Sequence, residues 1–316
     1  GQGGSVVGHA RPDGDCIGAQ VALHRVLSAR GLDVICVNAD AVPRRLQFLT
    51  AGIRFHRVDE LPADVASRAA IFVDCADHAR PGERLKSIFS RPHGAIDHHL
   101  SNCGYAAFNL VEPSSAATCE MLAGMFLDLG LPIDAATAQA LFTGIMTDTG
   151  QFRFASASAR CFRLAGELVA RGAQPADAGF QLYERESAAK LRLQEFLSSL
   201  RLECGGRVAI GVLAADAFSR TGANQEDTEG LVDYARSIDG VDIGALIQLN
   251  ADGSAKGSLR ARNATFRVDQ VAALFNGGGH ACAAGLSVKT GAAGFYERLR
   301  EALTQRLAQM DAANTL

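Results

Sequence analysis

Long apolar stretches are missing from this sequence. A membrane-spanning helix needs about 18 consecutive apolar residues, and no run approaches that length. The first residues show no basic start followed by an apolar run, so we expect no signal peptide. There is no internal repeat and no low-complexity tract. We therefore predict a cytoplasmic protein that does not bind membranes. The 316 residues, 48% hydrophobic and 21% charged, suit an ordinary globular enzyme of two domains.

The sequence also lacks an excess of basic residues and any Cys-x-x-Cys pair. A net charge of −3 argues against a protein that holds long DNA or RNA through its phosphates. It does not exclude short oligonucleotides, which present few phosphates. The 8 cysteines are spread through apparent core segments, so buried, reduced thiols are expected rather than a disulfide framework.

Short apolar runs alternate with helical periodicity through the first half of the chain. This alternation predicts an α/β fold, with a parallel sheet covered by helices on both faces. The expected strands are residues 5–8, 33–38, 70–74 and 94–97. The expected helices are residues 16–30, 114–129, 134–147, 158–171 and 176–183.

Residues 187–202 are charged, rich in leucine and free of glycine and proline, which predicts a linker helix. A smaller α/β domain follows at 203–316, and the catalytic domain covers 1–186. In the smaller domain we expect a strand at 208–213, a helix at 226–238 and a C-terminal helix at 292–309. Ala251-Asp252-Gly253 predicts a hairpin turn between strands at 242–249 and 256–262.

Four groups of acidic and histidine residues fall where predicted strands or helices end. They are His9 with Asp13 and Asp15, then Asp74, then Asp97 with His98 and His99, and finally Asp148. Ligands of open α/β sheets bind beyond the carboxyl ends of the strands, so these groups can converge on one crevice. Taken singly, an aspartate at such a place is more often a helix cap, and paired histidines are usually exposed. Four groups in matching contexts make that ordinary explanation improbable.

Carboxylates and imidazoles without thiolates suit manganese, cobalt or magnesium, and the imidazoles favour the first two. Six candidate ligands suit two metal ions better than one. A shared carboxylate can hold two such ions about 3.5–4 Å apart.

These residues resemble the four signature motifs of the DHH phosphoesterases. The motifs are His9-Ala-Arg-Pro-Asp-Gly-Asp-Cys-Ile-Gly18, Asp74-Cys-Ala-Asp77, Asp97-His-His99 and Gly144-Ile-Met-Thr-Asp-Thr-Gly150. Asn276-Gly-Gly-Gly-His280 is similar to the GGGH element of the DHH-associated domain, and Glu229–Arg236 and Ser258–Arg262 also fit that domain. The resemblance spans nearly the whole chain and is closest to the nanoRNase / pAp phosphatase branch. One departure is Ala19, where the family often has serine.

The resemblance implies a role for each motif residue. His9 and Asp13 would bind one metal ion, Asp15, His98 and Asp148 the other, and Asp74 would bridge them. Manganese is the first choice, with cobalt or magnesium as alternatives. His99 would contact the scissile phosphate, and Asp97 would orient the histidine pair.

In the second domain the resemblance implies a binding site for the substrate. Gly277, Gly278 and Gly279 lack Cβ atoms, so their backbone N–H groups can approach a phosphate, with His280 beside them. Arg260 and Arg262 would share one face of a strand and bind phosphate oxygens. Ordinary surface arginines on a hairpin are the alternative, more credible for Arg260.

The implied reaction is metal-dependent hydrolysis of very short oligoribonucleotides to 5′-mononucleotides. Removal of the 3′-phosphate of adenosine 3′,5′-bisphosphate (pAp) is expected as a second activity. The alternatives are a phosphodiesterase for cyclic dinucleotides or linear dinucleotides such as pApA and pGpG, and a silent nucleotide-sensing module. The partners are thus short nucleotides, and a homodimer is left open.

Overall fold

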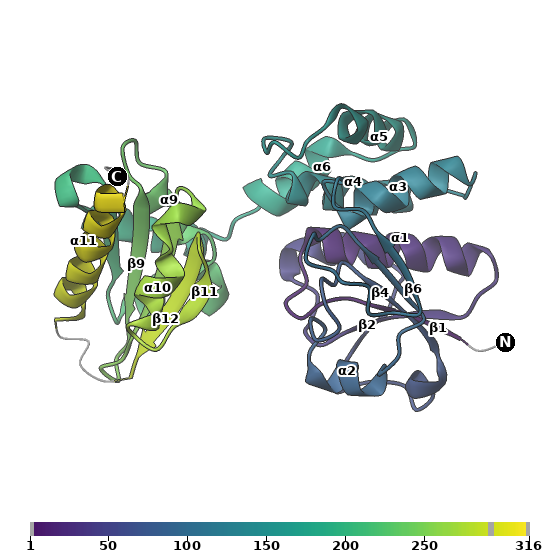
Figure 1. Ribbon diagram of the computed structural model, residues 1–316, viewed down its shortest axis with the longest axis horizontal. Helices are drawn as coiled ribbons and strands as arrows, with labels where there is room; N and C mark the ends of the chain where they lie inside the picture. Colours follow the sequence, from purple (N-terminus) through teal and green to yellow (C-terminus); the bar gives the residue numbers. More distant parts are fainter. Residues whose placement is uncertain (1–2, 290–293, 314–316) are drawn as a thin grey trace. The chain divides into compact units, whose positions relative to one another are not determined.

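The computed structural model describes residues 3–289 and 294–313, and the chain divides into two compact units, residues 1–185 and 186–316. Each unit contains its own six-stranded sheet with helices packed against it (Figure 1). The predicted fold class, a parallel-sheet domain followed by a smaller α/β domain, is confirmed.

The first sheet is entirely parallel and has the order β3-β2-β1-β4-β5-β6. Its strands are β1 (Gly4–Val7), β2 (Val34–Asn38), β3 (Phe55–Arg57), β4 (Ala69–Val73), β5 (Gly94–Asp97) and β6 (Phe108–Val111). The helices of this unit are α1 (Gly14–Ala29), α2 (Glu83–Ile88), α3 (Thr118–Asp128), α4 (Ala135–Asp148), α5 (Ala159–Ala170) and α6 (Pro175–Gly179).

Consecutive residues of β1 enter different cores, because neighbouring side chains of a strand point to opposite faces. Val6 packs into the cluster formed with α1, α3, α4 and α5, whereas Val7 packs with Phe72 and Leu85 of α2. Figure 1 shows α1, α3 and α4 on one side of the sheet and α2 on the other. The covered parallel sheet is thus the predicted one.

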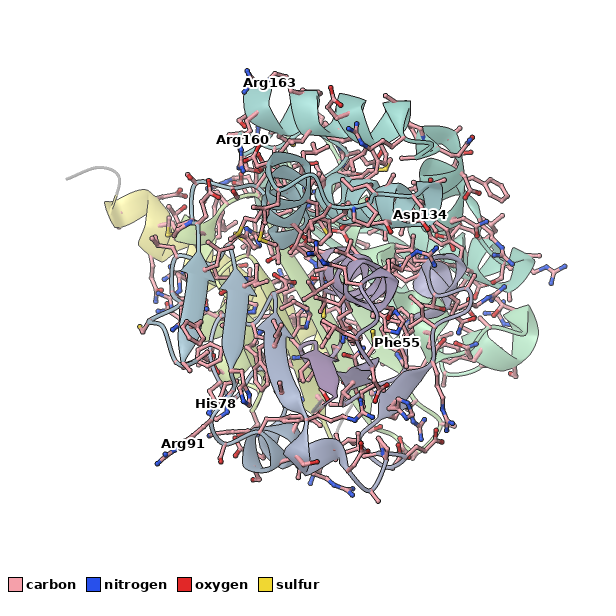
Figure 2. The ribbon with its side chains drawn as sticks, turned by 90° about the vertical axis from the view of Figure 1, so that its right-hand side faces the viewer. Phe55, His78, Arg91, Asp134, Arg160 and Arg163 are labelled. Carbon is pink, nitrogen blue, oxygen red and sulfur yellow. The ribbon has the colours of Figure 1, made fainter. Side chains whose placement is uncertain are left out.

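Several element boundaries differ from the expected ones. The helix expected at 114–129 begins only at Thr118, and the four residues before it form a turn and a bend that lead into the helix. The helix expected at 176–183 is divided into α6 and a π-helical turn, Phe180–Glu184. The edge strands β3, which carries Phe55 (Figure 2), and β6 were not predicted, because β3 has only 3 residues and β6 is largely exposed.

The second sheet is mixed and has the order β11-β12-β10-β9-β8-β7, with only β8 and β9 parallel among the described pairs. Its strands are β7 (Arg201–Glu203), β8 (Val208–Leu213), β9 (Ile243–Leu249), β10 (Ala255–Ala261), β11 (Gly278–His280) and β12 (Ala283–Val288). The helices of this unit are α7 (Ala188–Leu193), α8 (Ala217–Thr221), α9 (Leu231–Arg236), α10 (Val268–Ala273) and α11 (Phe295–Ala313).

The predicted hairpin between β9 and β10 is confirmed, with Asn250 N donating to Ser254 O at 2.9 Å. The single helix expected at 226–238 is wrong, because Gly230, at φ +81°, separates a short turn from α9. The C-terminal helix begins at Phe295, and its expected start at 292–293 lies outside the described residues.

The segment 187–202 is not one helix. It contains α7, a 3₁₀ turn over Gln194–Ser199 and the start of β7. Leu193 and Phe196 are fully buried in a cluster with Leu213 and Leu231. Leu191, Leu197 and Leu202 are exposed, so only part of the leucine-rich pattern reflects packing against the second sheet.

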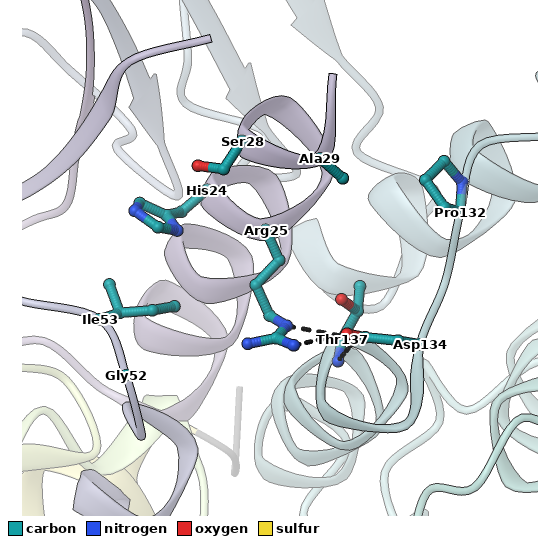
Figure 3. Close-up of a pocket in the computed structure, with 9 residues that line it drawn as sticks. All are labelled: His24, Arg25, Ser28, Ala29, Gly52, Ile53, Pro132, Asp134 and Thr137. Atoms are coloured by element: carbon teal, nitrogen blue, oxygen red, sulfur yellow. Dashed lines mark hydrogen bonds and ion pairs between the residues drawn. The ribbon is translucent and has the colours of Figure 1, made fainter. Parts of the chain in front are cut away.

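A shallow cavity of about 280 Å³ lies between α1 and the N-terminus of α4 (Figure 3). There Arg25 points at Asp134 and donates to both of its carboxylate oxygens, at 3.2 and 2.5 Å. Asp134 also caps α4 by accepting from Thr137 N. None of the predicted site residues lines this cavity, and the ion pair joins α1 to the N-terminus of α4 at a partly exposed position.

Two further sequence expectations concern thiols and membranes. All 8 cysteines are unpaired, five of them buried, but Cys103 is exposed. Across residues 3–289 and 294–313, no helix has both the length and the apolar character that a bilayer crossing requires.

Candidate metal centre

Three adjacent strands at the middle of the first sheet end at the predicted site. His9 follows β1 by two residues, Asp74 comes directly after β4, and Asp97 ends β5. Because β1, β4 and β5 are parallel neighbours, their carboxyl ends lie along one edge of the sheet. The first three predicted groups therefore meet as expected.

Two helices supply the remaining carboxylates. Asp13 caps α1 by accepting from Cys16 N at 3.1 Å, and Asp15 lies in the first turn of α1. Asp148 is the last residue of α4, which packs along α1. Asp13 thus has the ordinary role of a helix cap and also faces His9, whose Nε2 lies 3.6 Å from its Oδ1.

Asp74 is placed at the centre of the site by an uncommon backbone conformation. Its φ of +57° lies in the left-handed region, which only a few per cent of non-glycine residues adopt, aspartate more readily than most. The backbone N–H of Asp74 donates to Ile96 O at 3.0 Å, which holds this turn against β5. Such strain concentrates at functional sites.

The two carboxylate oxygens of Asp74 face different histidines. Oδ2 lies 3.3 Å from His9 Nε2, and Oδ1 lies 3.6 Å from His98 Nε2. One group of side chains therefore contains His9, Asp13 and one oxygen of Asp74. The other group forms around His98 and the second oxygen.

His98 is surrounded by carboxylates. Its Nε2 lies 3.2 Å from Asp148 Oδ2 and 3.9 Å from Asp15 Oδ2. The Nδ1 faces Ser115 O at 3.3 Å, so Nδ1 carries a proton and Nε2 is the nitrogen that faces the carboxylates. The Nε2 atom is buried and makes no hydrogen bond of acceptable geometry within the described residues. A buried ring nitrogen facing carboxylates in this way fits a bound cation.

His99 is held differently from His98. Its Nδ1 lies 2.8 Å from Asp97 Oδ1, and Asn102 donates to the other oxygen of Asp97 at 2.8 Å. Asp97 is buried, whereas the side chain of His99 is 34% exposed. We expected Asp97 to orient both histidines. Its carboxylate contacts only His99 of the pair in the described hydrogen bonds, whereas the carbonyl of Ser115 faces His98.

The site concentrates negative charge in a buried place. Burial raises the pKa of Asp74 to about 6, and nearby carboxylates add to the rise. Burial and the charges of neighbouring carboxylates also raise the pKa of Asp15 and of Asp148. Burial alone would lower the pKa of His98, but the carboxylates around it outweigh burial and raise it to about 10. All these shifts favour a proton, that is, an added positive charge.

The donor set matches divalent ions. The carboxylates and imidazoles fall into groups whose donor atoms lie within 4.8 Å of one another, including Asp74 with His98 and His99, and Asp15 with His98 and Asp148. Oxygen and imidazole donors are those that manganese, cobalt and magnesium accept. These residues therefore fit the group that the sequence implied.

Sequence reasoning missed several contributors. Thr118 Oγ1 donates to Asp74 Oδ1 at 3.3 Å, and the amides of Thr118 and Cys119 donate to Asp15 at 2.7 and 2.8 Å. Cys16 was not missed, since it stands beside Asp15 in the first motif, and it lies in one group with His9 and Asp74. The small and polar run before α3 was the available signal, but the pattern was assigned to a helix.

In the second unit, strand pairing places Arg260 and His280 in one row. Arg260 of β10 pairs with Ala283 of β12, which in turn pairs with His280 of β11. Directly paired residues of an antiparallel sheet lie on the same face, so both side chains emerge from one face. Arg260 is also 3.8 Å from Asp233 of α9. Arg262 lies one residue beyond the end of β10 and is exposed.

The three glycines before His280 differ in whether a side chain could fit in their place. A Cβ on Gly277 would lie 2.3 Å from Gly285 O, and one on Gly279 would lie 2.5 Å from Ala283 O. These two glycines are thus required by close packing on β12. A Cβ on Gly278 would meet no atom within 4 Å. The space above Gly278 is open to a ligand.

Comparison with known families agrees with this geometry. Residues 5–145 match the DHH family, N-terminal domain, and residues 205–309 match the DHHA1 domain. The chain belongs to the DHH family. It is therefore a phosphoesterase of the hydrolase class, as the motifs predicted.

Relatives with names cover nearly the whole chain. A bifunctional oligoribonuclease and PAP phosphatase NrnA from Thermus thermophilus is 31% identical over 95% of this chain and 89% of its own. A Bacillus subtilis protein of the same name is 24% identical over 89% and 87%. An exopolyphosphatase-related protein from Bacteroides fragilis has the same fold, with a TM-score of 0.86 and 24% identity, covering 100% of this chain and 94% of that one.

Proposed function

We propose that the chain is a two-metal phosphodiesterase and phosphatase for very short oligoribonucleotides and pAp. The observation that carries the proposal is Asp74, whose two oxygens face two separate groups of imidazole and carboxylate donors. The names of the Thermus thermophilus and Bacillus subtilis relatives support the choice of substrates. The products would be 5′-mononucleotides and, from pAp, a nucleoside monophosphate and phosphate.

In this proposal His9 and Asp13 would hold one divalent ion, Asp15, His98 and Asp148 would hold the other, and Asp74 would contribute to both. When bound, two such ions supply a nucleophile at neutral pH and stabilise charge on the phosphoryl oxygens. Manganese is the first choice of metal because imidazoles join the carboxylates. Burial of Asp15 and Asp74 restricts water around the donors.

His99 would serve the substrate rather than a metal. Hydrogen bonding between its Nδ1 and the buried carboxylate of Asp97 fixes the ring, so Nε2 is left to face the phosphate. The hydrogen bond to Asp97 raises the pKa of His99, which favours the protonated ring that would stabilise charge on the phosphate or act as a general acid. The partly exposed side chain is consistent with access to substrate.

The second unit would bind the part of the substrate that does not react. The row of Arg260 and His280, the open space over Gly278 and the exposed Arg262 supply charge and backbone N–H groups for phosphate oxygens. A net charge of −3 leaves little to hold a long backbone. We therefore expect the substrate to be short.

A substrate panel with manganese tests the proposal. pAp, pApA, pGpG, cyclic di-AMP and a 24-nucleotide RNA are compared by kcat/KM, with and without EDTA. Rapid turnover of the linear dinucleotides and of pAp, lost in EDTA, is expected. Equal rates on a dinucleotide and the long RNA would refute the size limit. A preference for cyclic di-AMP would favour the cyclic-dinucleotide alternative, and no turnover of any substrate would favour the silent module.

A further inference from the structure

The connection between β6 and α3, residues 112–117, and the first turn of α3 contact three proposed metal ligands through atoms not used in any motif. Ser115 O faces His98 Nδ1 at 3.3 Å. The amides of Thr118 and Cys119 donate to the two oxygens of Asp15. Thr118 Oγ1 donates to Asp74. This segment therefore determines how these ligands are aimed.

Glu120 holds the segment from inside the protein. Its side chain is 1% exposed, and Oε2 accepts from Ala116 N at 2.7 Å. This bond fixes the backbone between Ser115 and Thr118, which carries the contacts to the ligands. A carboxylate buried this deeply needs a cationic partner, because its charge has little solvent around it.

Arg160 of α5 is that partner. Its Nη1 lies 3.2 Å from Glu120 Oε1, 2.9 Å from Ser115 Oγ and 3.4 Å from Glu112 Oε1. Nη1 carries two hydrogens, so the two shorter contacts are the ones that it satisfies. One guanidinium nitrogen thus links Glu120 to the residue whose carbonyl faces His98.

The rest of α5 and α3 keeps this guanidinium in place. Ser158 caps α5, and the buried side chains of Cys161 and Leu168 anchor the helix in the main core. Gly124 of α3 leaves space for Arg160, since a Cβ there would lie 2.9 Å from Arg160 Nη2. Figure 2 shows Arg160 and Arg163 at the same end of α5.

We propose that Arg160 and Glu120 are positioning residues of the metal centre, which fix residues 115–119 and thereby aim Asp15, His98 and Asp74. The inference rests on the proposed two-metal function. Neither residue belongs to the candidate groups of metal ligands among the described residues. The contacts of the segment are to the Asp15–His98–Asp148 position and to the shared Asp74, and none of those described reaches His9 or Asp13.

This asymmetry gives the proposal a specific consequence. Loss of the Arg160 guanidinium should weaken metal binding mainly at the position formed by Asp15, His98 and Asp148. Changes to residues that orient metal ligands commonly cost about 10- to 100-fold in affinity. The position formed by His9 and Asp13 should keep an affinity close to that of the wild type.

The test is a titration of the metal-free full chain with Mn²⁺, followed by electron paramagnetic resonance and by calorimetry, which resolve two binding steps. Arg160→Ala should weaken one step by about 10- to 100-fold and leave the other nearly unchanged. Arg160→Lys keeps the positive charge but loses the planar guanidinium group with its several N–H donors. Its affinity at the weakened step should therefore lie between those of the wild type and of Arg160→Ala. Arg163→Ala, an exposed position on the same helix, is the matched control and should behave as wild type.

A second variant covers the case in which Arg160→Ala does not fold. Gly124→Ala keeps the guanidinium but displaces it, and alanine favours a helix more than glycine does, so the fold should be retained. It should weaken the same step by a smaller factor. Thermal melts of the metal-free proteins report stability separately from affinity.

Three results would overturn the proposal. The first is wild-type affinity for both ions in Arg160→Ala or, if that variant does not fold, in Gly124→Ala. The second is equal weakening of both steps together with a lower melting temperature, which would assign the cluster a structural role. The third is a wild-type chain that binds no divalent ion, which would remove the proposed function as well.

Discussion

Asp74 combines two features that each oppose stability. A non-glycine residue in the left-handed region costs on the order of 1–3 kcal/mol, and its carboxylate is buried among other anions, with a pKa raised to about 6. The cost is offset by the Asp74 N–H bond to β5 and by the donor from Thr118. Position and charge are thus maintained at some expense to folding, as expected of a functional group.

Asp74→Asn tests the bridging role. We expect activity to fall by several orders of magnitude, because the amide presents one neutral oxygen where two anionic oxygens face the two groups. Metal-free stability should be retained, since asparagine tolerates the left-handed conformation and carries no charge to bury. Activity and thermal melts are compared with Asp128→Asn, an exposed aspartate that ends α3. Near-wild-type activity in Asp74→Asn would contradict the bridge.

Alanine variants of His98 and His99 should differ in the number of metal ions that they bind. His98→Ala removes a buried nitrogen that has no hydrogen bond within the described chain, so we expect one metal equivalent to be lost. His99→Ala should keep both equivalents and lower kcat, because its ring is tied to Asp97. Inductively coupled plasma analysis of the purified variants gives the counts. Loss of a metal from His99→Ala but not from His98→Ala would reverse the assignment.

At the scale of elements, the motifs predicted convergence well because strand ends in a parallel sheet have a common edge. β1, β4 and β5 were recognised as strands from their apolar runs, and His9, Asp74 and Asp97 followed from them. What escaped prediction depended on backbone atoms. The carbonyl of Ser115 and the amides of Thr118 and Cys119 have no side-chain signature, and small residues before α3 resemble a helix start.

The prediction of one continuous helix over residues 187–202 was wrong for a related reason. The leucines of this segment fit a helical period, but the sequence does not show which of them will be buried, or against which sheet. Leu193 and Phe196 pack on the second sheet, and the chain leaves the helix to enter β7. Tertiary packing here overrides the local preference for a continuous helix.

Leucine substitutions in α7 test this placement. Leu193→Ala should lower the free energy of unfolding by about 2–5 kcal/mol, because a fully buried side chain leaves a cavity. Leu191, two residues earlier and 52% exposed, is the control, and its replacement by alanine should change stability by only about 0.5 kcal/mol. Urea denaturation monitors both variants. Similar effects of the two changes would indicate that α7 does not pack on the sheet.

The face of the second sheet that carries Arg260 and His280 should affect recognition more than chemistry. Remote binding energy positions the reacting bond, so its loss lowers kcat as well as affinity. His280→Ala should lower kcat/KM on pApA strongly and barely change hydrolysis of bis-p-nitrophenyl phosphate. Ser287→Ala, on β12 far from this row, is the control. If the ratio of kcat/KM on pApA to kcat/KM on bis-p-nitrophenyl phosphate is the same in His280→Ala as in the wild type, His280 has no role in substrate recognition.

For the whole molecule, the proposed ligands all lie in the first unit and the proposed recognition residues all lie in the second. Metal binding should therefore stabilise the first unit. At Mn²⁺ concentrations of about 100 times Kd, one bound ion adds about 2.7 kcal/mol to the stability of the folded state. We expect Mn²⁺ to raise the melting temperature and EDTA to reverse the rise. Asp74→Asn should lose most of this shift, and a shift of wild-type size in that variant would contradict binding at Asp74.

The central position of β1, β4 and β5 has one more consequence. Each of these strands is hydrogen-bonded to a neighbour on both sides, so none can separate without disrupting two ladders at once. Local opening starts where few bonds must break, at edges and chain ends. The backbone amides beside His9, Asp74 and Asp97 should then exchange with solvent only when the entire first unit opens. The strand ends that carry the metal centre should therefore resist local opening until the first unit unfolds as a whole.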